Sequence, residues 1–226
     1  PPADVTDTLT LVAPAPHGGR PVLQGGAPVG AARGALILLH GRGADAASMF
    51  DLAEVVAPPD LAWFAPEAAR NAWYPFSFLE SMDRNEPALT SALLAVQGLV
   101  EALGVAGSPP ARIALLGFSQ GACLALEYAA RHARRFGAVV GLSGGLIGPP
   151  GTPRSYPGSL SGTPVFLGCS DVDPHIPVER VHETKDVFTR MGAAVDTRIY
   201  AGMGHTVNDD EVDAVRMMLG AFVGTR

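Results

Sequence analysis

"RIALLGFSQGACLALEYAAR", residues 112–131, places a serine between two glycines, directly after an apolar run. The run at 112–117 is almost continuously apolar, which is typical of a parallel strand covered on both faces. Apolar residues at helical spacing follow Gly121, so an amphipathic helix is expected there. The stretch therefore predicts a strand, a sharp turn at Ser119 and a helix.

The spacing of the two glycines around Ser119 indicates what the turn is for. Gly117-x-Ser119-x-Gly121 is the pattern of the nucleophile elbow in α/β-hydrolases. A serine on so tight a turn has strained backbone angles, and a side chain at either flanking position would collide with the neighbouring strand or helix. Ser119 would then stand at the carboxyl end of the sheet, where open α/β sheets bind ligands. We therefore interpret Ser119 as a nucleophile rather than as an ordinary loop serine.

Strand-like and helix-like segments alternate along the whole chain. Further strands are predicted at 8–12, 35–40, 61–65, 137–143, 164–168 and 196–200. Helices are predicted at 87–103, 177–191 and 208–223, the last with Asn208 as its cap. The runs at 8–12 and 196–200 alternate in polarity, which suits strands near the edges of a sheet. The alternation predicts one α/β domain over residues 1–226, with a mostly parallel sheet and helices on both faces. The Gly/Pro-rich stretches at 14–34 and 148–164 are interpreted as a hairpin region and a surface loop.

Composition and charge exclude several classes of partner. The net charge is −6 and the pI is about 5.4, a balance that repels nucleic acid and anionic membranes. No apolar run approaches the roughly 20 residues that span a bilayer, so stable membrane insertion is not expected. The first ten residues show no secretion signal. Cys123 and Cys169 make neither a disulfide framework nor a metal-ligand spacing, so reduced cysteines in a cytoplasmic protein are expected.

A serine hydroxyl needs a neighbouring base to act as a nucleophile at neutral pH. Of six histidines, His205 in "YAGMGHTVNDD" (200–210) follows the last predicted strand, so it should face the same edge of the sheet as Ser119. The other histidines are expected elsewhere: His40 holding a loop by hydrogen bonds, His175 beside the site, His17 and His132 at the surface, and His182 in a helix.

The base in turn needs a carboxylate to orient it. "FLGCSDVDPHIP" (166–177) offers Asp171 and Asp173 just after a predicted strand. The order Ser119, Asp173, His205 matches the chain order of α/β-hydrolase triads. Asp173 is preferred because the prolines that follow it fix a turn before a helix. Asp171 stays open as an alternative whose first role would be to brace the loop through backbone amides.

Two further groups of residues complete the predicted site. The backbone N–H groups of Gln120 and Arg42, the latter in "HGRGADAAS" (40–48), are expected to form an oxyanion hole. The aromatic stretch "NAWYPFSF" (71–78) is expected to line a substrate pocket, although some of its side chains must belong to the core. The predicted substrate-binding residues are Trp73, Tyr74, Phe76, Leu146 and Met203.

Five segments resemble one family in order and spacing. They are "LLHGRGADAASM" (38–49), "PEAARNAWYPFSF" (66–78), "GFSQGACLALEYAAR" (117–131), "SDVDPHIPV" (170–178) and "GMGHTV" (202–207). Together, from about 34 to 223, the chain resembles the phospholipase/carboxylesterase family of small α/β-hydrolases, which includes bacterial carboxylesterases and acyl-protein thioesterases. The resemblance implies Ser119, Asp173 and His205 as a triad, and the amides of Gln120 and Arg42 as the oxyanion hole.

The resemblance also implies a compact enzyme without a large cap domain, often a homodimer, that needs no cofactor and no metal. Where relatives have His-Gly before the Asp-x-Asp-Pro turn, this chain has Cys169-Ser170.

From these observations we expect a serine carboxylesterase acting on small to medium apolar or aryl esters. An acyl-protein thioesterase or lysophospholipase is the alternative with the same chemistry. A ligand-binding protein that retains the hydrolase fold is the alternative from a different class.

Overall fold

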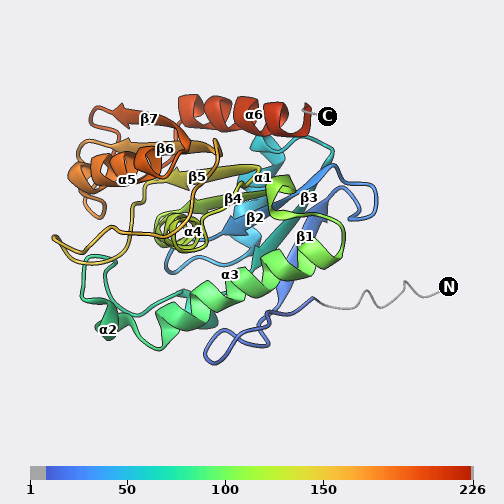
Figure 1. The fold of residues 1–226 in the computed structure, drawn as a ribbon, viewed down its shortest axis with the longest axis horizontal. Coiled ribbons are helices and arrows are strands. Elements are labelled where there is room, and N and C mark those ends of the chain that lie inside the picture. Colours follow the sequence, from blue (N-terminus) through green and yellow to red (C-terminus); the bar gives the residue numbers. More distant parts are fainter. Residues whose placement is uncertain (1–8, 225–226) are drawn as a thin grey trace.

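A seven-stranded sheet runs through the computed structural model, which describes residues 9–224 (Figure 1). The strands are β1 (Val22–Gly26), β2 (Gly34–Leu39), β3 (Leu61–Pro66), β4 (Ile113–Phe118), β5 (Ala138–Leu142), β6 (Pro164–Ser170) and β7 (Ala194–Tyr200). Their order in the sheet is β1-β3-β2-β4-β5-β6-β7, and only the pairing of β1 with β3 is antiparallel. The carboxyl ends of β2, β4, β6 and β7 therefore meet at one edge of the sheet.

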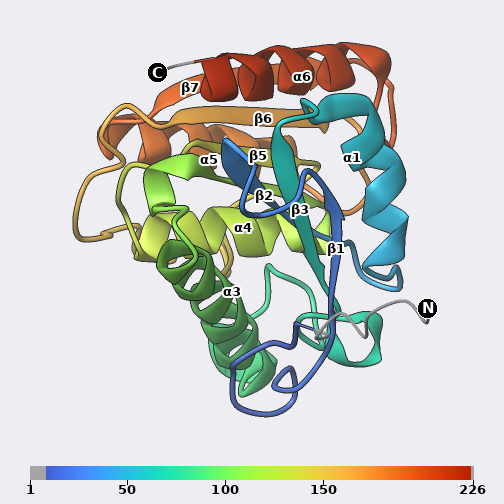
Figure 2. The same ribbon diagram turned by 90° about the vertical axis from the view of Figure 1, so that its right-hand side faces the viewer.

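Helices cover both faces of this sheet (Figures 1 and 2). On one face lie α1 (Phe50–Val56) and α6 (Asp209–Gly224), and on the other α3 (Ala88–Val105), α4 (Gln120–Arg131) and α5 (Val178–Arg190). The short helices are η1 (Ala47–Met49), η2 (Ala69–Asn71), α2 (Met82–Asn85) and η3 (Pro110–Arg112). This arrangement confirms the predicted α/β class.

The apolar strands are buried because each face of the sheet has its own core. Along β2, Ile37 and Leu39 belong to the core under α3 and α4, whereas Leu36 and Leu38 belong to the core under α1 and α6. All four are fully buried. Each contributes about 1.5–3 kcal/mol of hydrophobic free energy, which a strand with one solvated face could not gain from every residue.

The three predicted long helices are confirmed, with ends that differ by one or two residues. At the start of α6, the Asn208 side-chain oxygen accepts the Glu211 N–H at 2.9 Å, and Glu211 accepts the Asn208 N–H at 2.9 Å. This reciprocal capping box confirms Asn208 as the cap. By length and composition α3 could cross a membrane, but half of it is buried inside the described fold, as a core helix is.

The first predicted strand is wrong. Residue 8 lies outside the described residues, and 9–12 make only an isolated bridge, between Thr10 and Pro21. Leu11 exchanges backbone hydrogen bonds with Arg20 and Gly19 within a loop, so its amide and carbonyl are not available to the sheet. The edge strand is instead β1, inside the stretch interpreted as a hairpin region, and the other edge strand, β7, was predicted.

The prediction that His17 lies at the surface is also wrong, because the residue is fully buried. Its Nδ1 accepts the Ala69 N–H at 3.0 Å and its Nε2–H donates to the Trp73 carbonyl at 2.9 Å. Burial lowers the pKa of His17, so the ring is neutral and can serve as both donor and acceptor. His17 thus holds the segment that leads to the aromatic stretch at 71–78.

His132 is half-buried and stacks on Tyr128 at 4.6 Å between ring centroids.

Candidate active site

Ser119 stands alone between the last residue of β4 and the first of α4, with φ 54° and ψ −118°. A non-glycine residue in this region of the backbone map costs about 1–3 kcal/mol. A Cβ on Gly117 would lie 2.5 Å from the Ala122 nitrogen, and one on Gly121 2.6 Å from the His40 carbonyl oxygen and closer still to that of Leu39. The predicted strain and the predicted requirement for glycine are both confirmed.

The structure brings Ser119, His205 and Asp173 together from three separate loops. The Ser119 Oγ lies 2.9 Å from His205 Nε2, and His205 Nδ1 lies 2.7 Å from Asp173 Oδ2. Asp173 follows β6 and His205 follows β7, so both loops lie at the edge of the sheet where β4 ends. The hydroxyl, the imidazole and the carboxylate form one continuous chain of hydrogen bonds.

The surroundings of Asp173 determine which ring nitrogen of His205 carries the proton. Burial raises the pKa of Asp173, but hydrogen bonds from His205 and from the amides of His175 (2.8 Å) and Ile176 (3.0 Å) outweigh this effect, so the pKa lies below its usual value. An ionised Asp173 accepts the Nδ1–H of His205. Nε2 is then free to accept the hydroxyl proton of Ser119.

Asp171, the alternative carboxylate, does not reach His205. Its Oδ1 accepts the Gly202 N–H at 2.7 Å, and the neighbouring Ser170 Oγ accepts the Gly204 N–H at 3.1 Å. Both glycines have left-handed φ angles, 68° and 82°, in the loop that carries His205. Asp171 therefore braces this loop, which was its expected role.

Cys169, which stands where relatives have a histidine, keeps a hydrogen-bond donor near the Asp173 carboxylate. Burial raises the pKa of Cys169 to about 12, so the thiol stays protonated. Its sulfur lies 3.9 Å from Asp173 Oδ2, a weak contact from a neutral group.

The two residues of the predicted oxyanion hole lie in segments next to Ser119. The N–H of Gln120 is the first of α4, so it has no acceptor within its own helix. The loop that carries Arg42 passes so close that a Cβ on Gly41 would lie 3.4 Å from the Ser119 Cβ. His40 holds this loop, since its Nδ1–H donates to the Gly41 carbonyl at 2.8 Å and its Nε2 accepts the Ala68 N–H at 3.1 Å. His40 has the loop-holding role that the sequence predicts.

A cavity of about 560 Å³ opens beside Ser119 and His205. Apolar and aromatic side chains provide most of its wall, with a few polar groups. Its lining includes Ala44, Tyr74, Phe76, Phe78, Phe118 and Ile176, with Arg42, Ser77, Gln120, Cys123 and His175 as polar members. Of the five predicted substrate-binding residues, the structure brings Tyr74 and Phe76 to this cavity.

The other three predicted substrate-binding residues do not line it. Trp73 is fully buried, and its indole N–H donates to the His40 carbonyl at 2.9 Å. Leu146 is fully buried under α5. The Met203 sulfur faces the start of α6, where the Asn208 side-chain amide lies 2.9 Å from it. Each is held by a hydrogen bond that sequence patterns do not reveal, Trp73 to His40, Leu146 to Thr184 and Met203 to Asn208.

Phe118, His175, Ile176 and Cys123 are lining residues outside the predicted set. The His175 ring packs edge-on against His205 at 4.8 Å, and Phe118 lies 5.0 Å from the same ring. His175 was expected beside the site. Cys123 could have been found from its spacing, because residue i+4 lies on the same helix face as residue i.

Gln120 and Arg42 also position the aromatic wall through their side chains. The Gln120 amide accepts the Trp73 N–H and donates to the Tyr74 carbonyl, both at 2.8 Å. The Arg42 guanidinium donates to the carbonyls of Pro75 (2.7 Å) and Phe76 (2.5 Å). The segment at 73–76 is therefore tied to Gln120 and Arg42, the two residues of the predicted oxyanion hole.

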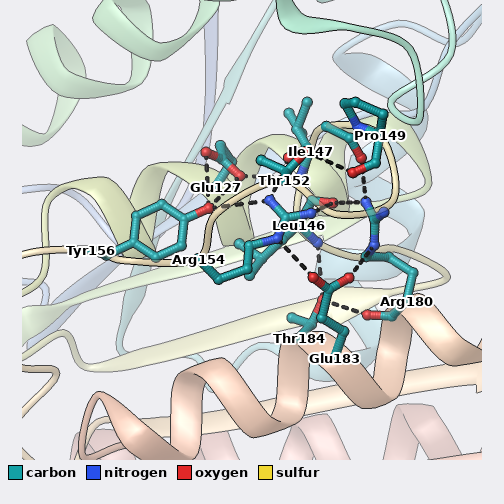
Figure 3. A network of polar contacts seen from close by, with 11 residues as sticks. Glu127, Leu146, Ile147, Pro149, Thr152, Arg154, Tyr156, Arg180, Glu183 and Thr184 are labelled. Atoms are coloured by element: carbon teal, nitrogen blue, oxygen red, sulfur yellow. Dashed lines mark hydrogen bonds and ion pairs between the residues drawn. The ribbon is translucent and has the colours of Figure 1, made fainter.

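A network of polar contacts anchors the loop between β5 and β6 (Figure 3). Glu183 pairs with Arg154 at 3.0 Å and with Arg180 at 2.6 Å, and Glu127 accepts the Ile147 N–H at 3.0 Å. The Arg154 and Arg180 side chains are only 6% and 4% exposed. The stretch at 148–164, interpreted as a surface loop, is thus pinned at its start to α4 and α5.

This network reaches the cavity through Phe78. The Gly148 N–H donates to the Phe78 carbonyl at 2.7 Å, and the Arg180 guanidinium lies 5.7 Å from the Phe78 ring centroid.

Within residues 9–224, no cluster of three His, Cys, Asp or Glu side chains is placed to hold a metal ion.

Comparison with known proteins gives the family of this chain. Residues 26–222 match the phospholipase/carboxylesterase family. The chain belongs to this family. Its members are serine carboxylic ester hydrolases with the α/β-hydrolase fold, and the chain is therefore an enzyme of the carboxylesterase and thioesterase type.

Proteins similar to this chain come from several organisms. A phospholipase/carboxylesterase from Dyadobacter fermentans is 38% identical with a TM-score of 0.85, covering 95% of this chain and 99% of that one. Acyl-protein thioesterase 1 of Saccharomyces cerevisiae is 28% identical over 215 residues, which are 84% of this chain and 93% of the yeast protein. A carboxylesterase from Mesorhizobium loti, at 24% identity and a TM-score of 0.67 over 89% and 93% of the two chains, shares the fold.

Proposed function

We propose that this family member is a carboxylesterase that uses Ser119 as nucleophile, His205 as base and Asp173 as the residue that orients the base. The observation that carries the proposal is the chain of two hydrogen bonds, 2.9 Å from Ser119 to His205 and 2.7 Å from His205 to Asp173. The strained elbow supports it, because strain of this kind persists where the surrounding structure enforces it and clusters at active sites.

The proposed reaction has two steps of the same form. His205 Nε2 takes the Ser119 proton as Oγ attacks the acyl carbon, and the amides of Gln120 and Arg42 stabilise the oxyanion. His205 then gives the proton to the leaving alcohol, which leaves an acyl group on Ser119. Water is activated in the same way, releases the acid and regenerates Ser119.

The cavity favours small to medium apolar or aryl esters. Its volume of about 560 Å³ and its aromatic wall match a site that recognises apolar groups by contact area and uses few polar groups. Nitrophenyl esters of increasing acyl length test this preference. A marked preference for long acyl chains would contradict it.

A thioester substrate is a second candidate, favoured by the curated relatives named acyl-protein thioesterase 1. The same nucleophile and oxyanion hole would serve both reactions. Paired assays on an ester and a thioester of one acyl group separate the two: the proposal expects the ester to have the higher kcat/KM after correction for the uncatalysed rates.

Labelling with a fluorophosphonate probe tests the proposed nucleophile directly. We expect one phosphonyl group per chain, lost in Ser119→Ala and retained in Ser155→Ala, which removes a hydroxyl from an exposed serine. Esterase activity should be lost in Ser119→Ala and retained in Ser155→Ala. A protein that shows neither labelling nor turnover would instead be a binding protein on a hydrolase fold.

A further inference from the structure

The cavity beside Ser119 carries a positive charge in a protein that is acidic overall. The chain has a net charge of −6, yet among residues 9–224 no Asp or Glu lines this cavity, whereas Arg42 does. The Asp173 side chain is buried and paired with His205, outside the cavity lining. A substrate group in the cavity therefore meets the charge of Arg42 without a carboxylate in the wall to compete for it.

The Arg42 guanidinium has no carboxylate partner of its own in the part of the chain that the structure describes. Its acceptors there are two uncharged backbone oxygens, the carbonyls of Pro75 at 2.7 Å and Phe76 at 2.5 Å. These bonds use two of the five N–H groups of a guanidinium, so three N–H groups have no acceptor within residues 9–224. The residue is exposed, so a ligand can reach these donors.

The Arg42 side chain runs from the nucleophile to the aromatic wall. It begins one residue after Gly41, whose Cβ, if present, would lie 3.4 Å from the Ser119 Cβ. It ends at the carbonyls of Pro75 and Phe76, with the guanidinium 6.0 Å from the Tyr74 ring centroid. The two carbonyls already hold the guanidinium in place, so it loses little conformational entropy when a ligand binds to it.

The chemistry of a fixed guanidinium favours one kind of ligand group. Its planar fork of N–H donors matches the two oxygens of a carboxylate, and hydrogen bonds between charged groups are stronger than those between neutral ones. A single arginine balances a single negative charge. The apolar wall can contact the rest of the ester, while one charged group fixes its orientation.

We infer that Arg42 is a specificity-determining residue whose guanidinium binds a carboxylate carried by the ester substrate. The inference rests on the proposed esterase function and refines its substrate class to esters that bear one free carboxylate. Half-esters of dicarboxylic acids carry this group on the acyl side of the ester. Esters of hydroxybenzoic acids carry it on the alcohol side.

The test compares carboxylate esters with carboxamide esters of the same shape. On the acyl side, nitrophenyl half-esters of adipic and suberic acid are paired with the corresponding ω-carboxamides. On the alcohol side, the butyrate ester of 3-hydroxybenzoate is paired with that of 3-hydroxybenzamide. Each kcat/KM is divided by the alkaline hydrolysis rate of the same ester, and the ratio of carboxylate to carboxamide is the readout.

Two variants of Arg42 separate its charge from its contacts with the wall, and both keep the backbone N–H proposed for the oxyanion hole. Arg42→Gln should lower the ratio about tenfold on the side that binds the carboxylate, a factor that corresponds to about 1.4 kcal/mol. Arg42→Lys keeps the charge and should stay within about threefold of the wild-type ratio. Loss of the bonds to Pro75 and Phe76 alone would slow both esters alike and leave the ratio unchanged.

Two matched controls remove other polar groups near the cavity. Arg84 lies 4.3 Å from the Phe76 ring centroid, pairs with Glu80 at 3.0 Å and is not part of the lining, so Arg84→Gln removes a nearby positive charge. His175→Gln replaces the other exposed polar ring of the lining. Both variants should keep the ratio within about threefold of the wild type.

A ratio that Arg42→Gln leaves unchanged on both sides of the ester, with nitrophenyl acetate still cleaved in a Ser119-dependent manner, would overturn the inference and leave the proposed function intact. An equal fall of the ratio in Arg84→Gln or His175→Gln would also overturn it, because the effect would not belong to Arg42. Absence of Ser119-dependent hydrolysis of every ester would refute the proposed function instead.

Discussion

Replacing Asp173 with asparagine tests how the site selects the tautomer of His205. The Asp173 Oδ1 accepts two backbone N–H groups, at 2.8 and 3.0 Å, whereas Oδ2 faces His205 Nδ1 at 2.7 Å. In Asp173→Asn the amide oxygen stays at the Oδ1 position, because reversing the amide would break two hydrogen bonds of about 1 kcal/mol each. The NH₂ group then points at His205 Nδ1.

That arrangement forces His205 into the wrong tautomer. Nδ1 must accept a hydrogen bond from the new amide, so the proton moves to Nε2, which can no longer take the proton of Ser119. The variant also lacks the negative charge that stabilises the imidazolium. We expect kcat/KM for a nitrophenyl ester to fall about 10⁴-fold, equivalent to about 5 kcal/mol of transition-state stabilisation.

Asp171→Asn is the matched control, since among residues 9–224 the Asp171 carboxylate bonds to the Gly202 N–H and not to His205. It should keep kcat/KM within about tenfold of the wild type. Steady-state kinetics and thermal unfolding, measured on both variants, separate chemistry from folding. An Asp173→Asn enzyme that is folded and within tenfold of the wild type would refute the reasoning.

Three further predictions concern the fold around the site. Gly121→Ala should abolish folding or cost more than about 4 kcal/mol in urea unfolding, because its Cβ would meet strand backbone, whereas Gly104→Ala, with open space around it, should stabilise by up to about 1 kcal/mol. Glu183→Ala should cost about 3 kcal/mol, because it removes the carboxylate that two buried guanidinium groups share and leaves them only uncharged oxygen acceptors. Glu80→Ala, which removes an exposed pair, should cost less than about 1 kcal/mol, and equal losses would contradict this. Burial raises the pKa of Glu211 from 4.5 to about 7, so its ionisation opposes folding and stability is lost as the pH rises between these values. Glu211→Gln should therefore raise the unfolding temperature by several degrees at pH 8 and much less at pH 5, and an equal gain at both would show that ionisation is not the cause.

The parts of the site that the sequence predicted are those set by local geometry and by strand order. The elbow at Ser119 follows from two glycines and a strand–helix junction, all within a few residues. His205 and Asp173 could be placed near it because parallel strands end at one edge of a sheet. The structure places His205 within hydrogen-bonding distance of both Ser119 and Asp173.

The parts that the sequence did not predict depend on side-chain direction in loops. Trp73 and Tyr74 are neighbours in an aromatic stretch, yet one is held against His40 and the other lines the cavity. His17 is buried by contacts with residues more than 50 positions away, which no local pattern reports. The strand at 22–26 contains two glycines, so its composition does not predict a strand. Its pairing with β3 makes it the edge strand of the sheet.

A crystal structure of the enzyme after reaction with a phosphonate ester tests the central claim most directly. We expect phosphorus bonded to the Ser119 Oγ, with the phosphoryl oxygen within hydrogen-bonding distance of the amides of Gln120 and Arg42 and His205 still paired with Asp173. Phosphorus attached to any other residue, or a His205 ring out of bonding reach of the Ser119 Oγ, would contradict the account.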